Sequence, residues 1–190
     1  MPRWIVLPAS LIIAVFILLP AVSNSSASPG VPKSRIVRVL DGKVRLTLPQ
    51  LAANPEVLSD RVAVIQPQSD RPDLKYIIYA IREDLRPDLS ALSNKSLNQS
   101  IRTTLQGLGL QIVGMVNSRN TFVVDFRAPM DAGILPWQKV GPGLARGTAK
   151  FVRTGSEISG AVLLCDPSQW NDETTQIFRN VIGGTKVRTK

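Results

Sequence analysis

Few residues in this 190-residue sequence are suited to catalysis or metal binding. The sequence contains no histidine and one cysteine, Cys165. Histidine is the commonest general base and zinc ligand, and a lone cysteine can form neither an internal disulfide nor a cysteine-rich metal site. The composition therefore argues against most familiar active sites, and we expect neither a cofactor nor a metal.

The carboxylates Glu83, Asp84 and Asp88 lie close together and could in principle form an acid–base pair. Arg82 and Arg86 alternate with them, which is more typical of solvated charge between two structural elements. The sequence contains neither G-x-S-x-G nor S-x-x-K, so a serine nucleophile would need a lysine or N-terminal amine as its partner. We therefore expect no enzyme, and a hydrolase that lacks a recognisable signature is the alternative.

Two further features could carry chemistry and favour simpler interpretations. Gly141, Gly143 and Gly147 form G-P-G-L-A-R-G, but no Lys-Ser/Thr pair follows them and they precede a strand rather than a helix, unlike a phosphate-binding loop. These glycines are expected to relieve a loop and thin a strand. Cys165 ends an apolar run, which favours a buried and inert thiol.

The segment 128–143 is rich in proline and glycine and is expected to form a long surface loop. It carries apolar residues together with Trp137 and Lys139, so it could bind a partner or fold back over a sheet edge to close the core. Arg146 and Lys150 follow on the predicted strand 144–153, where alternation places both on its solvent face. These cations could bind an acidic partner, or protect the edge of the sheet from aggregation.

The net charge of +9 would suit an anionic partner. However, charged residues make up 19% of the chain and aromatic residues 5%, and the basic residues are dispersed, so nucleic acid is not expected. The favoured partner is a protein of the envelope or membrane, acidic in character, with an anionic membrane surface as a further candidate.

The N-terminal segment 1–27 has one early arginine, an apolar run and a small, polar end, as in a secretory signal peptide. A retained membrane anchor over residues 4–22 is the alternative. Residues 28–35 are predicted to be a linker, 36–184 a single domain and 185–190 a basic tail. The mature protein is therefore expected to be periplasmic or lumenal.

Apolar patterning and turn residues predict the elements of the domain. Predicted strands cover 36–40, 43–48, 61–66, 75–82, 111–116, 121–127, 144–153 and 157–165. One predicted helix covers about 88–107, with Asp88 as its N-cap, and a second starts near 166–168 and stops at 183–184. Because each helix has one apolar stripe to bury, these elements predict an α+β fold with an antiparallel sheet of about six to eight strands and two helices packed on it.

The order of these elements, together with Val44-Arg45-Leu46-Thr47-Leu48-Pro49 and the closing Val162-Leu163-Leu164-Cys165-Asp166-Pro167-Ser168-Gln169-Trp170, resembles the PsbP/DcrB-like family over about residues 42–182. The resemblance implies a PsbP-like fold and a non-catalytic auxiliary or partner-binding role, and it supplies no catalytic residues. The long segment 128–143 and the basic charge depart from the family.

These observations predict an exported, non-enzymatic auxiliary protein that binds a macromolecular partner at the cell envelope or lumen. The residues expected to contact that partner are Trp137, Lys139, Arg146 and Lys150. A carrier that holds an apolar small molecule in a cleft near Trp137 is a further alternative.

Overall fold

The computed structural model describes residues 34–68, 70, 74–107, 109–129 and 144–188. These residues form an α+β fold with two antiparallel sheets, which confirms the predicted fold class. The strands are β1 (Ser34–Val39), β2 (Val44–Pro49), β3 (Glu56–Val57), β4 (Val62–Ile65), β5 (Tyr76–Asp84), β6 (Gln111–Ser118), β7 (Thr121–Pro129), β8 (Leu144–Thr154), β9 (Glu157–Cys165) and β10 (Lys186–Val187). The helices are α2 (Pro87–Ser90), α3 (Asn94–Gly107) and α4 (Asp172–Gly184), and the short 3-10 helix η1 (Pro167–Gln169) precedes α4.

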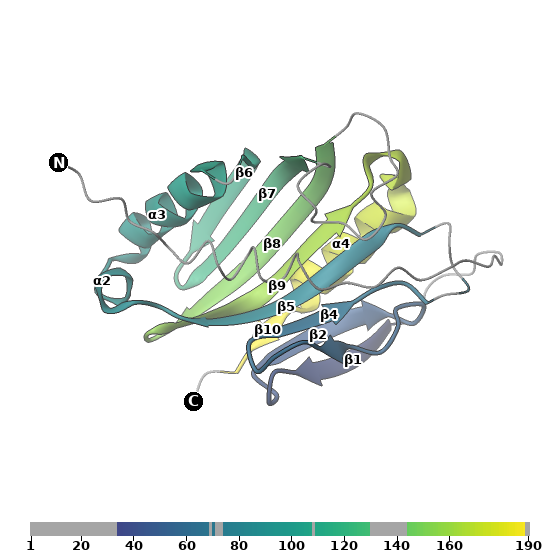
Figure 1. Cartoon of the computed structure of the whole chain (residues 1–190), viewed down its shortest axis with the longest axis horizontal. Helices are drawn as coiled ribbons and strands as arrows, with labels where there is room; N and C mark the ends of the chain where they lie inside the picture. The colour runs from purple at the N-terminus through teal and green to yellow at the C-terminus, as the bar shows by residue number, and fades with distance from the viewer. Residues whose placement is uncertain (1–33, 69, 71–73, 108, 130–143, 189–190) are drawn as a thin grey trace.

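The larger sheet has seven strands in the order β3-β4-β5-β9-β8-β7-β6, and the smaller sheet has the order β1-β2-β10 (Figure 1). Tight turns set the register of the hairpins. Asp41 and Gly42 form the turn between β1 and β2, both with positive φ, and Gly155 has φ +62° between β8 and β9. Glycine adopts this backbone conformation without steric cost, which is why the predicted hairpins at these positions are found.

The seven-stranded sheet is buried on both faces at its centre. Residues 76–80 of β5 are at most 1% exposed, which confirms the prediction that this apolar run is a central strand. On one face, α4 and the three-stranded sheet pack against Leu163 and its neighbours. On the opposite face, Leu105 of α3 packs near Val124 and Phe126 of β7.

The predicted single helix over 88–107 is wrong, because the chain breaks between α2 and α3. The Ser93 hydroxyl accepts a hydrogen bond of 3.2 Å from the backbone N–H three residues later and so starts a new helix. The Arg153 guanidinium donates to the carbonyl oxygens of Ser90 and Leu92, which the break leaves without helical partners. Asp88 lies in the first turn of α2, after the cap position at Arg86, so its predicted capping role is also wrong.

The last helix starts later than the sequence predicted. Asp166 caps the short η1, its carboxylate accepting from the backbone N–H of Ser168 at 2.8 Å. The α4 helix then starts after Asn171, whose side chain and that of Thr174 each accept a hydrogen bond of 3.0 Å from the other residue's backbone N–H. Beyond α4, residues 186 and 187 of the predicted tail form β10 and pair with β2.

Candidate interaction surface

The structure separates the four residues predicted to contact a partner. Arg146 and Lys150 lie on β8, whereas Trp137 and Lys139 lie outside the described residues. Arg146 is exposed, and Lys150 is half-buried. The two cations share one side of β8, as predicted, but α4 packs on that side, so the expectation that both face solvent is wrong for Lys150.

Lys150 is bound by the end of α4. Its Nζ donates to the carbonyl oxygens of Ile182 and Thr185, at 3.0 and 2.9 Å. The last carbonyls of a helix have no partners within the helix and carry its negative dipole end, so a cation is stabilising there. Burial, and then the nearby charge of Lys186, lower the pKa of Lys150. This lysine therefore joins β8 to α4.

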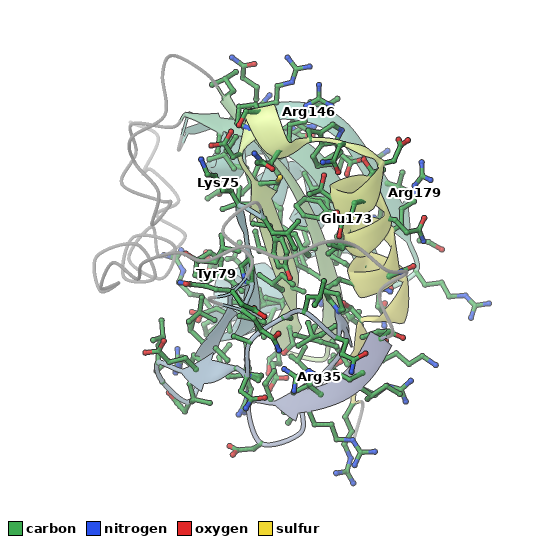
Figure 2. All side chains as sticks on the ribbon, turned by 90° about the vertical axis from the view of Figure 1, so that its right-hand side faces the viewer. Arg35, Lys75, Tyr79, Arg146, Glu173 and Arg179 are labelled. Carbon is green, nitrogen blue, oxygen red and sulfur yellow. The ribbon has the colours of Figure 1, made fainter. Side chains whose placement is uncertain are left out.

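Arg146 lies at the other end of α4 and presents its charge to solvent. Its guanidinium carbon is 5.1 Å from the centre of the Trp170 ring, a cation–π contact. Trp170 in turn packs edge-on against Phe178 of α4, with ring centres 5.2 Å apart. Figure 2 shows Arg146 at the end of the molecule opposite Arg35. Arg127 of β7 is directly opposite Arg146 and is also exposed, so two cations lie side by side at this end of the sheet.

A row of paired residues shows where α4 stops covering this face. Val116, Val123, Lys150, Ala161 and Ala80 are directly opposite one another on β6, β7, β8, β9 and β5, and therefore lie on one face. Ala161 and Ala80 are fully buried, Lys150 and Val123 are half-buried, and Val116 is 66% exposed. We call the uncovered part, formed by Val116, Val123, Asp125 and Arg127, the open face.

The edge of the sheet beside the open face is also accessible in the described part of the chain. Strand β6 is the last of its sheet, and its sequence Gln111-Ile112-Val113-Gly114-Met115-Val116-Asn117-Ser118 contains no charged residue. Val113, at a bulge in this strand, is 66% exposed. Natural sheet edges usually carry charges that prevent pairing with other chains, and here the bulge is the protection. Strand β6 exposes Val113 and Val116 beside the charged Asp125 and Arg127, and exposed apolar residues bordered by polar ones are typical of an interaction site.

Two solved structures have the same arrangement of elements. Cyanobacterial PsbP (CyanoP) from Synechocystis sp. PCC 6803 superimposes with a TM-score of 0.54 at 12% identity, over 87% of this chain and 98% of that one. The Ran-binding protein Mog1p from Saccharomyces cerevisiae superimposes with a TM-score of 0.55 at 10% identity, over 84% and 97% of the two chains. This chain has the PsbP-like fold. The predicted resemblance is therefore confirmed for the fold, while no family model and no curated protein sequence matches the chain.

In this PsbP-like fold the clustered carboxylates are paired with arginines. Arg61 contacts Glu83 and Asp84, each at 3.5 Å, and Arg86 contacts Asp88 at 2.7 Å. Desolvation raises the pKa of Glu83, and the charge of Arg61 opposes the increase. Asp84 and Asp88 are exposed, as expected for solvated charge, whereas Glu83 is largely covered and paired with Arg61.

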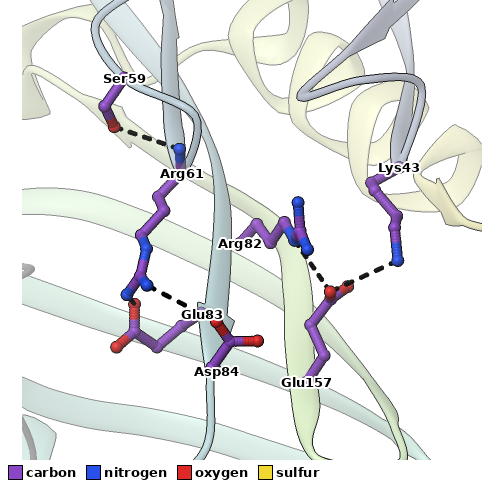
Figure 3. Close-up of polar contacts among 7 residues, drawn as sticks. All are labelled: Lys43, Ser59, Arg61, Arg82, Glu83, Asp84 and Glu157. Atoms are coloured by element: carbon purple, nitrogen blue, oxygen red, sulfur yellow. Dashed lines mark hydrogen bonds and ion pairs between the residues drawn. The ribbon is translucent and has the colours of Figure 1, made fainter.

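A second charged group connects the two sheets of the PsbP-like fold (Figure 3). The Glu157 carboxylate of β9 accepts from Arg82 of β5 at 2.8 Å, from Lys43 of the β1–β2 hairpin at 3.4 Å and from the Ser159 hydroxyl at 2.9 Å. Desolvation acts to raise the pKa of Glu157, but these hydrogen bonds and positive charges together outweigh it, so the pKa is lowered. Both carboxylate oxygens are bound by donors within the fold, which indicates a structural connection.

The remaining chemically interesting residues are also structural. Cys165 is fully buried, as predicted, and burial raises its pKa to about 12. Gly147 lies against the ring of Phe126, where a methyl group would be only 2.5 Å away, so glycine does thin this strand. In the described residues no three of the side chains Cys, Asp and Glu are grouped for a metal ion. No helix of the described residues is long and apolar enough to cross a membrane.

Proposed function

We propose that this protein is an exported, non-enzymatic auxiliary that binds a protein partner at the cell envelope or lumen through the open face. The single observation that carries the proposal is the exposure of Val116. Ala161 and Ala80, which belong to the same row of paired residues on β9 and β5, are fully buried. The fold accommodates such a role, since Mog1p, which has the same fold, is described as a Ran-binding protein.

Arg127 and Arg146 outnumber Asp125, the one carboxylate of the open face, and this balance of charge favours an acidic partner. Protein interfaces combine an apolar centre with a polar rim, and here Val116 and Val123 are bordered by the exposed Arg127 and Arg146. Like charges on directly opposite strand positions repel each other, so a carboxylate from a partner would relieve this repulsion and steer association. Lys150 is not part of the proposed contact, because α4 already binds its ammonium group.

Trp137 and Lys139 extend the proposed contact. Strands β7 and β8 flank segment 130–143. Arg127 lies two residues before the end of β7, and Arg146 lies two residues after the start of β8. Large aromatic residues are frequent binding hot spots, which supports Trp137 as the anchor. Export is proposed from the signal-like composition of residues 1–27.

Site-specific photo-cross-linking tests the proposed surface in the native compartment. A photoreactive amino acid replaces Val116 on the open face or, as the control, the exposed Gln99 of α3. We expect one discrete cross-linked protein band from position 116 and none from position 99. Equal cross-linking from both positions, or none from position 116, would contradict the proposal.

Replacing Trp137 by alanine tests the proposed anchor. We expect the affinity for the cross-linked partner to fall by about 2 kcal/mol with an almost unchanged melting temperature, since the side chain would act at the interface. A loss of about 3 to 5 kcal/mol in the free energy of unfolding would show instead that Trp137 closes the core. Both quantities are to be measured on the same sample.

A further inference from the structure

The outer side of the three-stranded sheet carries a second group of cations, far in sequence from Arg127 and Arg146. Arg38 of β1, Arg45 of β2 and Lys186 of β10 are directly opposite one another across the three strands. They alternate with buried residues such as Val44 and Leu46, so they lie on the side that faces away from the core. The fold thus brings together cations that are up to 148 positions apart in the sequence, from residue 38 to residue 186.

These cations surround a pocket of about 410 Å³. It is lined by Arg38, Gly42, Arg45, Lys186, Val187 and Arg188. Two features position the walls. The turn between β1 and β2 brings Gly42 to one side, and the backbone N–H of Arg188 donates to the carbonyl oxygen of Lys43 at 2.9 Å, which fixes the chain after β10. The walls are therefore built from backbone pairing on three strands.

The pocket has no carboxylate in its lining, and its cations lack internal partners. In the described part of the chain, the side chains of Arg38, Arg45, Lys186 and Arg188 form neither an ion pair nor a hydrogen bond, and the Nε of Arg45 is buried without an acceptor. The nearby acid Glu157 is bound by Lys43 and Arg82. Like charges opposite one another on neighbouring strands are destabilising, and a buried unpaired donor costs further free energy. An external anion would remove both costs.

We propose that this pocket binds the phosphomonoester group of an organic ligand. A phosphomonoester carries close to two negative charges and three acceptor oxygens, which match several cations at once. Arginine presents a planar fork of donors that fits phosphate oxygens in pairs, and three of the four cations are arginines. Ligand pockets for organic molecules have volumes of about 300 to 1,000 Å³, so this pocket has room for an organic group attached to the phosphate.

The group could belong to a soluble organic phosphate or to the headgroup of a phospholipid, and the chemistry of recognition is the same. The pocket shares no residue with the open face, so this inference stands independently of the proposed protein partner.

The test measures binding of two probes to the full chain at constant ionic strength. Glycerol 3-phosphate is titrated calorimetrically, and co-sedimentation is measured with phosphatidylcholine vesicles that contain or lack phosphatidic acid. The variant Arg45→Gln removes the central cation, and Arg179→Gln, an exposed position on α4, is the charge-matched control. We expect Arg45→Gln to weaken binding at least tenfold and Arg179→Gln to change it less than twofold.

The two probes distinguish the sources of the phosphate. Binding of glycerol 3-phosphate would identify a soluble ligand, and binding of phosphatidic acid vesicles alone would identify a lipid headgroup. The proposal is overturned if neither probe binds, if both variants lose affinity equally, or if polyglutamate binds more tightly than either probe. The melting temperature without ligand provides a second measurement. It should rise or stay unchanged in Arg45→Gln, because repulsion is removed, and a fall of several degrees would show that Arg45 supports the fold itself.

Discussion

One face of the seven-stranded sheet has a covered half and an open half. Over β5 and β9, α4 and the three-stranded sheet bury Ala161 and Leu163 completely. Over β6 and β7, no comparable layer covers the described residues, and Val116 is 66% exposed although it belongs to the same row as Ala161. The strand pattern is the same in both halves, so the covering element decides whether an apolar residue stabilises the fold or is available to a partner.

The same difference applies to the cations. Lys150, at the border of the covered half, binds the last carbonyls of α4 and contributes to stability. Arg146 and Arg127 lie further out and remain exposed. A basic residue is therefore available for binding only where the fold supplies no acceptor for it.

The largest expected effect distinguishes a buried apolar residue of the covered half from an exposed one of the open half. Leu163→Ala should reduce the free energy of unfolding by about 2 to 5 kcal/mol, because it leaves a cavity in a fully buried site. Val116→Ala should change it by about 0.5 kcal/mol or less. Urea unfolding of both variants measures this difference, and equal losses would show that β6 is covered in solution.

A smaller effect separates the two cations of β8. Lys150→Met should cost about 1 to 2 kcal/mol, because two carbonyl oxygens at the end of α4 lose their charged donor. Arg146→Met should cost less than about 1 kcal/mol, since an exposed cation–π contact is weak. Thermal unfolding of the two variants gives the comparison. A larger loss of stability in Arg146→Met than in Lys150→Met would show that Arg146, and not Lys150, is the cation that stabilises the fold.

The smallest expected effect concerns pH and the Glu157 group that connects the sheets. Because the folded pKa of Glu157 is lowered, its ion pairs stabilise the protein above the usual pKa of about 4.5 and are lost as the pH falls through the folded value. Glu157→Gln should thus be less stable than the wild type near pH 7, and the difference should shrink below pH 4. Melting temperatures measured from pH 7 to pH 3 test this, and a difference that is constant over the range would refute it.

The sequence was informative wherever the structure depends on neighbouring residues. Turn residues such as Asp41-Gly42 and Gly155 fix hairpin register locally, so the hairpins and the central strand were predicted close to their observed positions. The break between α2 and α3 was not predicted because it depends on Arg153, about 60 residues away in the sequence. Its guanidinium donates hydrogen bonds to the carbonyl oxygens that the break leaves free. Helical periodicity alone continues across such a break.

The candidate sites were less predictable for the same reason. The role of Lys150 depends on α4, and the tail residue Lys186 reaches Arg45 only through β10, a strand of two residues that is too short to predict. One signal was available: a two-residue turn at Asp41-Gly42 places Arg38 opposite Arg45. That register predicts two arginines side by side on one face of the hairpin.

Inserting a charge at two equally exposed valines tests whether the open face is the binding surface, with the affinity for the cross-linked partner as the measurement. Val116 on the open face and Val57 of β3, at the opposite edge of the same sheet, are 66% and 62% exposed. We expect Val116→Arg to weaken binding at least tenfold with an unchanged melting temperature, and Val57→Arg to bind like the wild type. Wild-type affinity in Val116→Arg would contradict the claim that the open face is the binding surface.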